Sequence, residues 1–431
     1  MTDLLELSSK IIDENITDRQ INRINFQLSE LTEDIAMVEA FSHSIVFKTS
    51  EGLLVIDTSN EGGGKQVVEA IRGWSKDPFN TLIYTHGHLD HVGGSSSFLA
   101  DVKESGGSYL RVIAHENMLA RFDRYEFTSG YNMVINMRQF GNLFGGAMNV
   151  IGEHDFFSKK IVRPNLTYSE SLSFKMGDLD VNLHFGKGET DDHTWAWIPQ
   201  LKAICAGDFF IWNFPNAGNP QKVQRYPVEW AEVLRKMAGL DAELLLPSHG
   251  LPIQGQARIK TVLLEAASAL ELVVKQTLEM MNSGATLNEI IHAVKVPDEV
   301  ISKPYLVPRY DDPEFIVNNI WRLYGGWYDG DPANLKPART DQLAEEYSVL
   351  AGGAINLAKR AQTLAESDEL RLACHLVEMA KLSEPDNVEI HQIRADVYDQ
   401  RRQAESSLMA KGIYGNASTD SQKKVDDSKS V

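Results

Sequence analysis

A cluster of potential metal ligands lies between residues 84 and 94, in the stretch YTHGHLDHVGG. Three histidines and one aspartate fall within six residues there: His86, His88, Asp90 and His91. In a tight turn, alternate residues such as His86 and His88 can bind one ion, while Asp90 and His91 point towards a second. Zinc accepts imidazole and carboxylate ligands alike, and a catalytic zinc site keeps one position open for water. The spacing therefore predicts a site where two metal ions activate water for hydrolysis.

The elements around this cluster are short strands that alternate with helices between residues 34 and 251. The segment TLIY before His86 is short, apolar and β-branched, which predicts a buried strand. Strand-like segments also precede the loops at Glu189, Asp208 and His249. Side chains that follow the ends of strands lie on a rigid edge, where binding residues are common. We therefore expect an α/β region, rich in strands, with the site at its edge.

The second half of the chain has helical periodicity. The stretch ARIKTVLLEAASALELVVKQTLEMMNSG has apolar residues at helical spacing, with Gly284 as its stop. Residues 341–412 include one helix pair of tetratricopeptide type, which by itself predicts no array. The polar tail NASTDSQKKVDDSKSV predicts disorder. The sequence thus predicts a catalytic domain over 1–255, a helical domain over 256–415 and a disordered tail over 416–431.

Charge and composition exclude several classes of partner. The net charge of −18 argues against nucleic acid, because phosphate binding needs a basic field. No segment approaches the roughly 20 apolar residues that a membrane span requires. The N-terminal segment has acidic residues where a signal peptide has basic ones, and the two cysteines, Cys205 and Cys374, are typical of reduced thiols. We therefore expect a cytoplasmic protein.

Four motifs resemble the metallo-β-lactamase superfamily over most of residues 34–255. THGHLDHVGG resembles the first ligand motif of that family, and GKGETDDHTWAWIP stands where the family has Gly-His-Thr. KAICAGD resembles the bridging-aspartate motif, and LLLPSHG resembles the motif of the last histidine. The resemblance implies an αββα sandwich with a metal site at the sheet edges. The fold class is therefore expected to be α/β, with an all-helical region after the sandwich.

The resemblance also implies seven ligands for two zinc ions per chain. The first ion would be bound by His86, His88 and Glu189. The second ion would be bound by Asp90, His91 and His249, with Asp208 between the two ions. Metal-bound hydroxide would attack the substrate. Asp57, in LLVIDTS, matches the buried strand-end aspartate of the family, which supports a ligand.

Glu189 departs from most of the superfamily, which has a histidine after the glycine at this place. Here the chain resembles the linear alkyl-sulfatase branch, which has a glutamate there and its next carboxylate ligand 19 residues later. Asp208 likewise follows Glu189 by 19 residues. The stretch PEFIVNNIWRLYGGWYDGDPANLKP is similar to the helical dimerisation domain of that branch. The resemblance implies a homodimer that acts on a small-molecule ester.

The loop after Asp208 departs from the alkyl-sulfatase pattern. The sulfate-binding arginine of that branch is absent from its expected place in FFIWNFPNAGNPQKVQRYPVEW, and Lys222 and Arg225 lie nearby. We predict that these two cations bind the substrate. Asp90 is expected to act at the metal centre, and His193 and Tyr226 are expected to donate the proton that a leaving alkoxide needs.

Two other functions stay open beside the hydrolysis of an alkyl sulfate ester. Within the same chemistry, a carboxylic ester or a lactone is the main alternative to the sulfate ester. The alternative from another class is a metal-binding interaction protein without turnover. Such a protein would need a degraded ligand set, whereas this set is complete when Glu189 is counted.

Overall fold

The computed structural model describes residues 3–19, 21–140 and 156–429. Contacts between residues divide the described chain into two compact units. The first unit includes the described residues up to Ser129, residues 156–284 and Ile290–Tyr324, and the second includes residues 130–140, 285–289 and those from Gly325 onward. The sequence predicted a boundary at residue 255, but helix α8 (Gln256–Asn282) packs on α7 (Pro227–Ala238) and belongs to the first unit.

Seven strands form the first sheet, in the order β1 to β7 along the chain. Their bounds are Leu28–Glu30, Ile35–Val38, Ser44–Thr49, Gly52–Ile56, Phe79–Ile83, Arg111–His115 and Leu166–Tyr168. The strands β1 to β4 pair antiparallel, whereas β4 to β7 pair parallel. Strands β4 and β5 consist almost entirely of buried residues, as expected for strands covered on both faces.

Six strands form the second sheet, in the order β13-β12-β11-β10-β9-β8. In chain order, the bounds of β8 to β13 are Ser171–Met176, Leu179–Gly186, His193–Ile198, Ala203–Gly207, Leu244–Pro247 and Ile253–Gln254. All pairs are antiparallel except β11 with β12. The Tyr168 hydroxyl donates to Thr194 Oγ1 at 2.8 Å, which joins β7 of the first sheet to β10 of the second.

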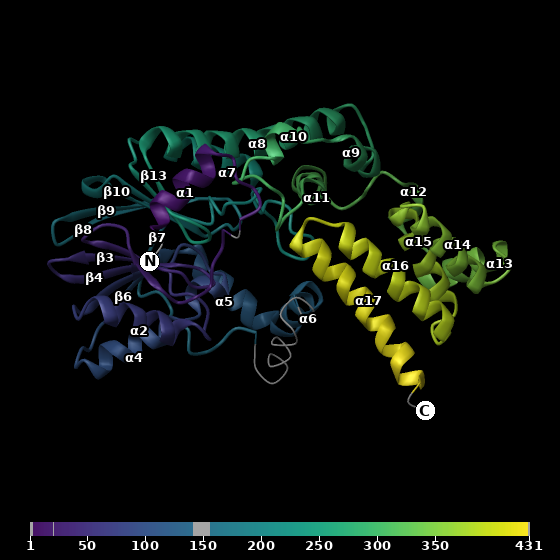
Figure 1. Ribbon diagram of the computed structural model, residues 1–431, viewed down its shortest axis with the longest axis horizontal. Helices are drawn as coiled ribbons and strands as arrows, with labels where there is room; N and C mark the ends of the chain where they lie inside the picture. Colours follow the sequence, from purple (N-terminus) through teal and green to yellow (C-terminus); the bar gives the residue numbers. More distant parts are fainter. Residues whose placement is uncertain (1–2, 20, 141–155, 430–431) are drawn as a thin grey trace. The chain divides into compact units, whose positions relative to one another are not determined.

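Helices cover the outer face of each sheet. Figure 1 shows α2 and α4 on one side of the paired sheets and α7 and α8 on the other. The helices of this unit that precede α7 are α1 (Leu4–Asp13), α2 (Gly64–Trp74), α3 (Leu89–Val92), α4 (Ser95–Glu104) and α5 (Asn117–Phe127). Buried residues of β4, β5, β6, α2, α4 and α5 form one apolar core. This arrangement confirms the predicted αββα sandwich.

The remaining helices lie C-terminal to α8, apart from α6 (Ser129–Phe140), which spans the boundary of the two units. In chain order, α9 to α12 are Leu287–Ala293, Asp298–Ile301, Pro313–Gly325 and Pro332–Leu335. Helices α13 to α17 are Thr340–Leu350, Ala354–Glu366, Leu370–Ser383, Val388–Ala404 and Leu408–Lys429. Residues of α14, α15 and α16 form a separate apolar core. The prediction of an all-helical second half is confirmed beyond β13.

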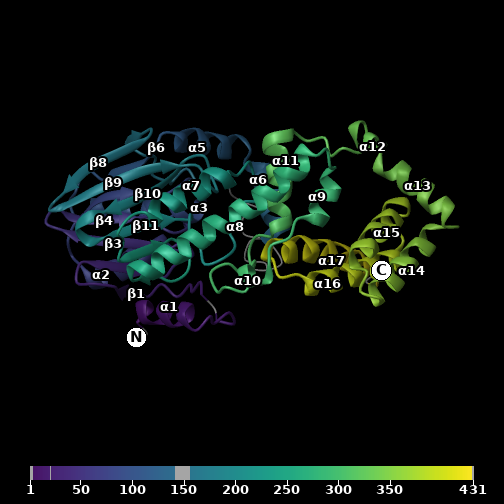
Figure 2. The same ribbon diagram turned by 90° about the horizontal axis from the view of Figure 1, so that it is seen from above.

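The predicted disorder of residues 416–431 is wrong for the part that the structure describes. Helix α17 continues to Lys429 and packs along α16, as the views from the side and from above both show (Figures 1 and 2). Ser421 and Val425 of α17 are buried, and the Ser421 hydroxyl lies 2.9 Å from Nδ1 of His391 on α16. Packing on α16 stabilises a sequence whose polar composition does not favour order by itself.

Candidate metal centre

The seven predicted ligands meet at the C-terminal ends of four strands. His86 and His88 follow β5, and Asp90 and His91 belong to the short helix α3 behind them. Glu189, Asp208 and His249 follow β9, β11 and β12 of the second sheet. The two sheets thus bring together residues that are up to 163 positions apart, because each strand ends at the same edge of the sandwich.

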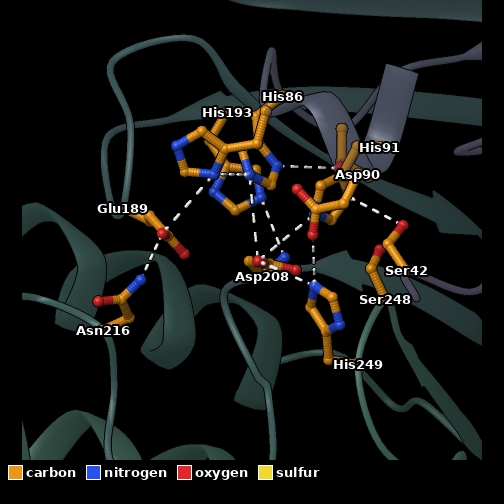
Figure 3. A network of polar contacts seen from close by, with 12 residues as sticks. Ser42, His86, Asp90, His91, Glu189, His193, Asp208, Asn216, Ser248 and His249 are labelled. Carbon is orange, nitrogen blue, oxygen red and sulfur yellow. Dashed lines mark hydrogen bonds and ion pairs between the residues drawn. The ribbon is translucent and has the colours of Figure 1, made fainter. Parts of the chain in front are cut away.

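The ligand atoms form three groups, and in each group all atoms lie within 4.8 Å of one another. The first ligand group is His86, His88 and Glu189. The second ligand group is Asp90, His91 and His249. The bridging group is His86, His91 and Asp208, so it shares a histidine with each of the other two. Figure 3 shows six of these side chains directed toward a common space: His86, Asp90, His91, Glu189, Asp208 and His249.

Asp208 occupies the middle of the arrangement. Its Oδ2 atom lies 3.5 Å from Nε2 of His91 and 3.5 Å from Nε2 of His249. The same oxygen lies 4.0 Å from Nε2 of His86 in the first ligand group. Asp90 Oδ2 lies 3.3 Å from Nε2 of His249 on the other side. One carboxylate therefore reaches toward both ligand groups.

Several buried polar atoms of this cluster have no hydrogen-bond partner among the described residues. They are Glu189 Oε2, His91 Nε2 and Asp208 Oδ1. Buried polar atoms are normally paired, so unpaired atoms in a native structure need an explanation. A cation that accepts nitrogen and oxygen ligands would pair with all three, one from each group. The donor set of imidazoles and carboxylates fits zinc.

The electrostatics of the cluster suit metal binding. Burial lowers the pKa of both His86 and His88 well below the ordinary value, so these rings are neutral, the form that binds a metal. Burial opposes ionisation of Asp208, but the neighbouring His249 and His91 hold its pKa below the ordinary value. At neutral pH Asp208 is thus ionised while His86 and His88 are neutral. Burial acts to lower the pKa of His91 and His249, but the neighbouring carboxylates of Asp208 and Asp90 raise both above the ordinary value, so a metal ion would displace a proton from these two rings.

Asp57 contacts His91 of the second ligand group and orients its ring. It lies at the end of β4, is fully buried, and accepts hydrogen bonds from the Thr85 amide at 2.8 Å and the Ser248 hydroxyl at 2.7 Å. Its Oδ2 atom also lies 2.7 Å from Nδ1 of His91. A carboxylate on one ring nitrogen of a histidine orients the other nitrogen for a metal. This is the place that the sequence motif assigned to Asp57.

Glu189 is fixed by two neighbours on the loop between β11 and α7. Arg225 NH2 and Asn216 Nδ2 donate to Glu189 Oε1 at 2.9 Å and 2.5 Å. The Arg225 side chain is 1% exposed, and its Nε donates to the Asn216 carbonyl at 2.8 Å. Burial raises the pKa of Glu189, and Arg225 acts in the opposite direction. The Arg225 guanidinium is thus paired with the carboxylate of a candidate ligand. The sequence predicted that Arg225 binds the substrate and did not predict this contact.

His193 lies behind Asp208, fully buried. Its Nε2 atom accepts a hydrogen bond from the Asp208 amide at 3.2 Å, and its ring stacks on Phe209. Gly207 has a φ of +55°, and a Cβ there would lie only 2.6 Å from that Nε2 atom. Burial lowers the pKa of His193 to about 3, so the ring is neutral. This geometry favours support of the Asp208 backbone over donation of a proton.

Lys222 and Tyr226 lie on the loop that also carries Arg225. Lys222 is partly buried. Burial and the neighbouring charge of Arg225 lower the pKa of Lys222 to about 8, while Glu189 and Asp90 act to raise it. Tyr226 is partly buried, which raises its pKa, and its ring centroid lies 5.1 Å from Lys187 Nζ. The predicted roles of Lys222 and Tyr226 toward a substrate stay predictions.

Two features of the site had no place in the sequence prediction. Arg121 Nε donates to Asp192 Oδ1 at 2.8 Å, and Asp192 Oδ2 accepts from the Gly87 amide at 2.9 Å, which ties α5 to two ligand loops. The Tyr310 phenol is buried, which raises its pKa, and it interacts electrostatically with Glu189 and Asp90. In the sequence, the feature that could have pointed to Asp192 is its position three residues after Glu189. Tyr310 lies in an aromatic run that also suits core packing, so the sequence did not distinguish it.

Comparison with known proteins assigns the family. The metallo-beta-lactamase superfamily profile matches residues 38–249, which contain all seven ligand positions. Residues 38–249 therefore belong to the metallo-beta-lactamase superfamily. The profile for alkyl sulfatase dimerisation matches residues 286–424, which confirms the predicted alkylsulfatase-like branch of that superfamily.

Alkylsulfatases are among the similar proteins. A linear primary-alkylsulfatase from a Pseudomonas species is 26% identical over 324 residues, which cover 72% of this chain and 60% of that protein. The alkyl/aryl-sulfatase BDS1 from Saccharomyces cerevisiae is 24% identical over 412 residues, which cover 90% of this chain and 62% of that protein. This superfamily member therefore spans about 60% of the length of these curated relatives.

A solved structure has the same fold. The stereoselective inverting sec-alkylsulfatase Pisa1 from a Pseudomonas species superposes with a TM-score of 0.80 and 21% sequence identity. The match covers 93% of this chain and 66% of that one. The likeness extends over the sandwich and the helices after it.

Proposed function

We propose that this chain is a zinc-dependent hydrolase of ester bonds, with alkyl sulfate esters as its substrate class. The ligand set supports this proposal most directly, because three overlapping groups of three side chains each lie within reach of a metal ion. The similarity to alkylsulfatases supports the choice of a sulfate ester.

Two zinc ions per chain fit the donor set. The first ligand group would bind one ion, the second ligand group would bind the other, and Asp208 would contact both. Bound zinc lowers the pKa of water and stabilises the negative charge that develops as the ester bond breaks. Asp57 orients His91 for this task, and Arg225 orients Glu189. Asp90 belongs to the second ligand group and acts in the reaction through it.

Lys222 is the cation that we assign to the sulfate group. It lies on the same loop as Arg225, and the charges of Glu189 and Asp90, one from each ligand group, act to raise its pKa. A charged ammonium group would stabilise an anionic ester through charge-assisted hydrogen bonds. Arg225 is assigned to Glu189 instead, because its buried guanidinium donates to that carboxylate. Tyr226 remains the predicted proton donor for the leaving group, whereas His193, also predicted as a donor, is assigned to the Asp208 backbone because its Nε2 accepts from that amide.

We further propose that the chain forms a homodimer through the region that matches alkyl sulfatase dimerisation. Helix α13 of that region exposes Leu343, Tyr347 and Leu350, and the Leu350 side chain is 84% exposed. Apolar side chains of this kind are typical of surfaces that bind another protein. Among the described residues, no helix is long and apolar enough to span a membrane. A cytoplasmic location stays a prediction, based on two free cysteines, Cys205 and Cys374.

Metal analysis combined with a substrate screen tests the proposal. Purified protein, dialysed against zinc and then freed of loose metal, should contain about two zinc ions per chain. It should hydrolyse a sulfate ester of a medium-chain alcohol faster than the phosphate or acetate ester of the same alcohol. Preference for the acetate or for a lactone would favour the alternative substrate class. Metal without turnover on any ester would favour an interaction protein.

A further inference from the structure

The carboxylate of Glu189 has one oxygen engaged and one available. Oε1 accepts the hydrogen bonds from Arg225 and Asn216 and lies 3.7 Å from Nδ1 of His88, whereas Oε2 is buried and has no hydrogen-bond partner among the described residues. A carboxylate held in this way has a fixed direction toward the first ligand group. The position of Arg225 therefore determines how Glu189 meets a metal ion.

Arg225 is itself held in place by helix α11, through Asn319. The Asn319 side chain makes both hydrogen bonds of an amide pair with the Arg225 backbone: Nδ2 donates to the Arg225 carbonyl at 2.9 Å, and Oδ1 accepts from the Arg225 amide at 3.3 Å. Asn319 is 3% exposed. Its Oδ1 atom also accepts from Gln224 Nε2 at 2.9 Å. An amide side chain offers a donor and an acceptor side by side, and the other amide residue, glutamine, has a longer chain.

A second contact joins the same loop to the start of α11. The Gly218 amide donates to Asp311 Oδ2 at 2.6 Å, and both groups are buried. A Cβ at Gly218 would lie 2.5 Å from the Phe315 side chain and 2.6 Å from the Ile316 nitrogen, so only glycine permits this approach. The loop is thus fixed at two points, one on each side of Lys222, by residues 311–319. That segment belongs to the region that matches alkyl sulfatase dimerisation, outside the matched metallo-beta-lactamase region.

We propose that Asn319 is a positioning residue for the metal site, which acts through Arg225 on the ligand Glu189. The helical region of the chain thereby completes a site whose ligands all lie within residues 86–249. This inference rests on the proposed function, because it requires that Glu189 bind a metal. Its reach is limited to the first ligand group, since Asp57 and Ser248 orient the second ligand group independently of α11.

Asn319→Ala, compared with Asn318→Ala, tests the proposal in the full chain. Asn318 is the matched control because it is the same residue type on the same helix, is exposed, and bonds only to the Glu314 carbonyl one turn earlier among the contacts described for it. Asn319→Ala should weaken binding of one of two zinc ions by about 10- to 100-fold in competition with a chromophoric chelator. The other ion should keep its affinity. Asn318→Ala should bind both ions as the unmodified protein does.

Cobalt substitution separates a positioning role from a general loss of structure. The absorption spectrum of Co²⁺ reports ligand geometry, so Asn319→Ala should change the bands of one ion only. In a Glu189→Gln background the carboxylate is gone, and Asn319→Ala should then have little further effect on metal affinity. If Asn319→Ala does not fold, Asn319→Asp replaces it, because aspartate keeps the size and the acceptor for the Arg225 amide but loses the donor to the Arg225 carbonyl; it should show the same selective loss.

The outcomes distinguish this inference from the proposed function. Unmodified protein that binds no metal at all contradicts the proposed function itself. Unmodified protein that binds two ions, together with an Asn319→Ala variant of the same affinity and cobalt spectrum, overturns the inference alone. Equal weakening of both ions, or equal losses in both Glu189 backgrounds, also overturns it, since the effect would not pass through Glu189.

Discussion

The Oδ2 atom of Asp57 lies 2.7 Å from Nδ1 of His91, and both side chains are fully buried. Asp57 has a φ of +60°, a left-handed conformation that aspartate adopts only with local support. Thr85 supplies that support, because its amide and hydroxyl both donate to the carboxylate. The backbone strain at the end of β4 therefore serves the orientation of one ligand ring.

Asp57→Asn should lower the affinity of the second ligand group for zinc by about 10- to 100-fold. The substitution replaces one carboxylate oxygen by an amide group, which cannot accept a hydrogen bond from Nδ1 of His91 or from Thr85. Zinc competition with a chelator measures the change. Ser42→Ala is the control, because the Ser42 hydroxyl lies 3.4 Å from the same nitrogen and should matter little. Unchanged affinity in Asp57→Asn would contradict the assigned role.

Asp208→Ala should remove both ions at once, since its carboxylate reaches toward both ligand groups. We expect the zinc content to fall from about two ions per chain to less than one, together with ester hydrolysis. Metal analysis after dialysis provides the measurement. Asp178→Ala, at an exposed turn between β8 and β9, should keep the full metal content. Retention of one tightly bound ion in Asp208→Ala would show that Asp208 serves only one group.

Glu189→Ala and His193→Ala should differ in their effect on metal. Glu189→Ala should lower the affinity for one zinc ion by at least about 10- to 100-fold. Loss of a residue that only supports a ligand has an effect of this size, and loss of the ligand itself should be no smaller. His193→Ala should keep both ions more tightly than Glu189→Ala does, because the ring packs on His86 but its Nε2 accepts from the Asp208 amide. Titration of zinc into each apo variant tests this order. The reverse order would make His193 the ligand.

Lys222→Ala should reduce the hydrolysis of sulfate esters by about 10- to 150-fold. The range corresponds to a charge-assisted hydrogen bond of roughly 1.5–3 kcal/mol, at about 1.4 kcal/mol for each factor of ten. A neutral carboxylic ester should be hydrolysed almost as before. Values of kcat/KM for both esters of one alcohol provide the measurement. Arg225→Ala should instead reduce the hydrolysis of both esters, because it acts through Glu189. If Lys222→Ala reduced the hydrolysis of both esters equally, Lys222 would not be the residue that binds the sulfate group.

Asp311 should make the folded protein less stable as the pH rises from about 4 to about 7. Burial raises the pKa of this carboxyl to about 7, although the amides of Gly218 and Asp312 donate to it. Between the ordinary value of 3.8 and about 7, the folded state therefore binds more protons than the unfolded state, and the free energy of unfolding decreases with pH. Below that window the group contributes no pH dependence.

Asp311→Asn removes this titration. The difference in the free energy of unfolding between the unmodified protein and the variant should fall by roughly 1–4 kcal/mol across the window. Urea unfolding of both metal-free proteins at several pH values measures the difference, in which other titrating groups cancel. A difference that is constant with pH would show that Asp311 titrates normally.

The candidate ligands came from motifs that resemble the superfamily, and the strand ends before them came from local apolar patterns. The run TLIY before His86 and the run ELLLP before His249 each predicted a strand end, and strand ends of one sandwich meet at one edge. The fold was therefore accessible from short segments together with the resemblance. The partner of Arg225 was not, because Glu189 lies 36 residues away in the loop after β9 and only the packing of the two loops brings the residues together.

Contacts of the helical region were also beyond the sequence. Asn319 is one of two adjacent asparagines, and nothing in the stretch VNNIW distinguishes the buried one from the exposed one except the register of a helix whose neighbours are unknown. Similarly, the polar tail gave no sign of helix α17, because its order derives from packing on α16 and not from its own composition.

Helix α17 has a consequence for any shortened form of the chain. The Ser421 hydroxyl lies 2.9 Å from Nδ1 of His391 and accepts from NH1 of Arg394 at 2.9 Å, and the carbonyl of Ala417 accepts from the same NH1 atom. A chain that ends at residue 415 would lose these partners, and the buried face of α16 that carries His391 and Arg394 would be exposed to water. The polar segment after residue 415 is therefore a packed part of the helical fold, and deleting it would expose a helix face that is otherwise covered.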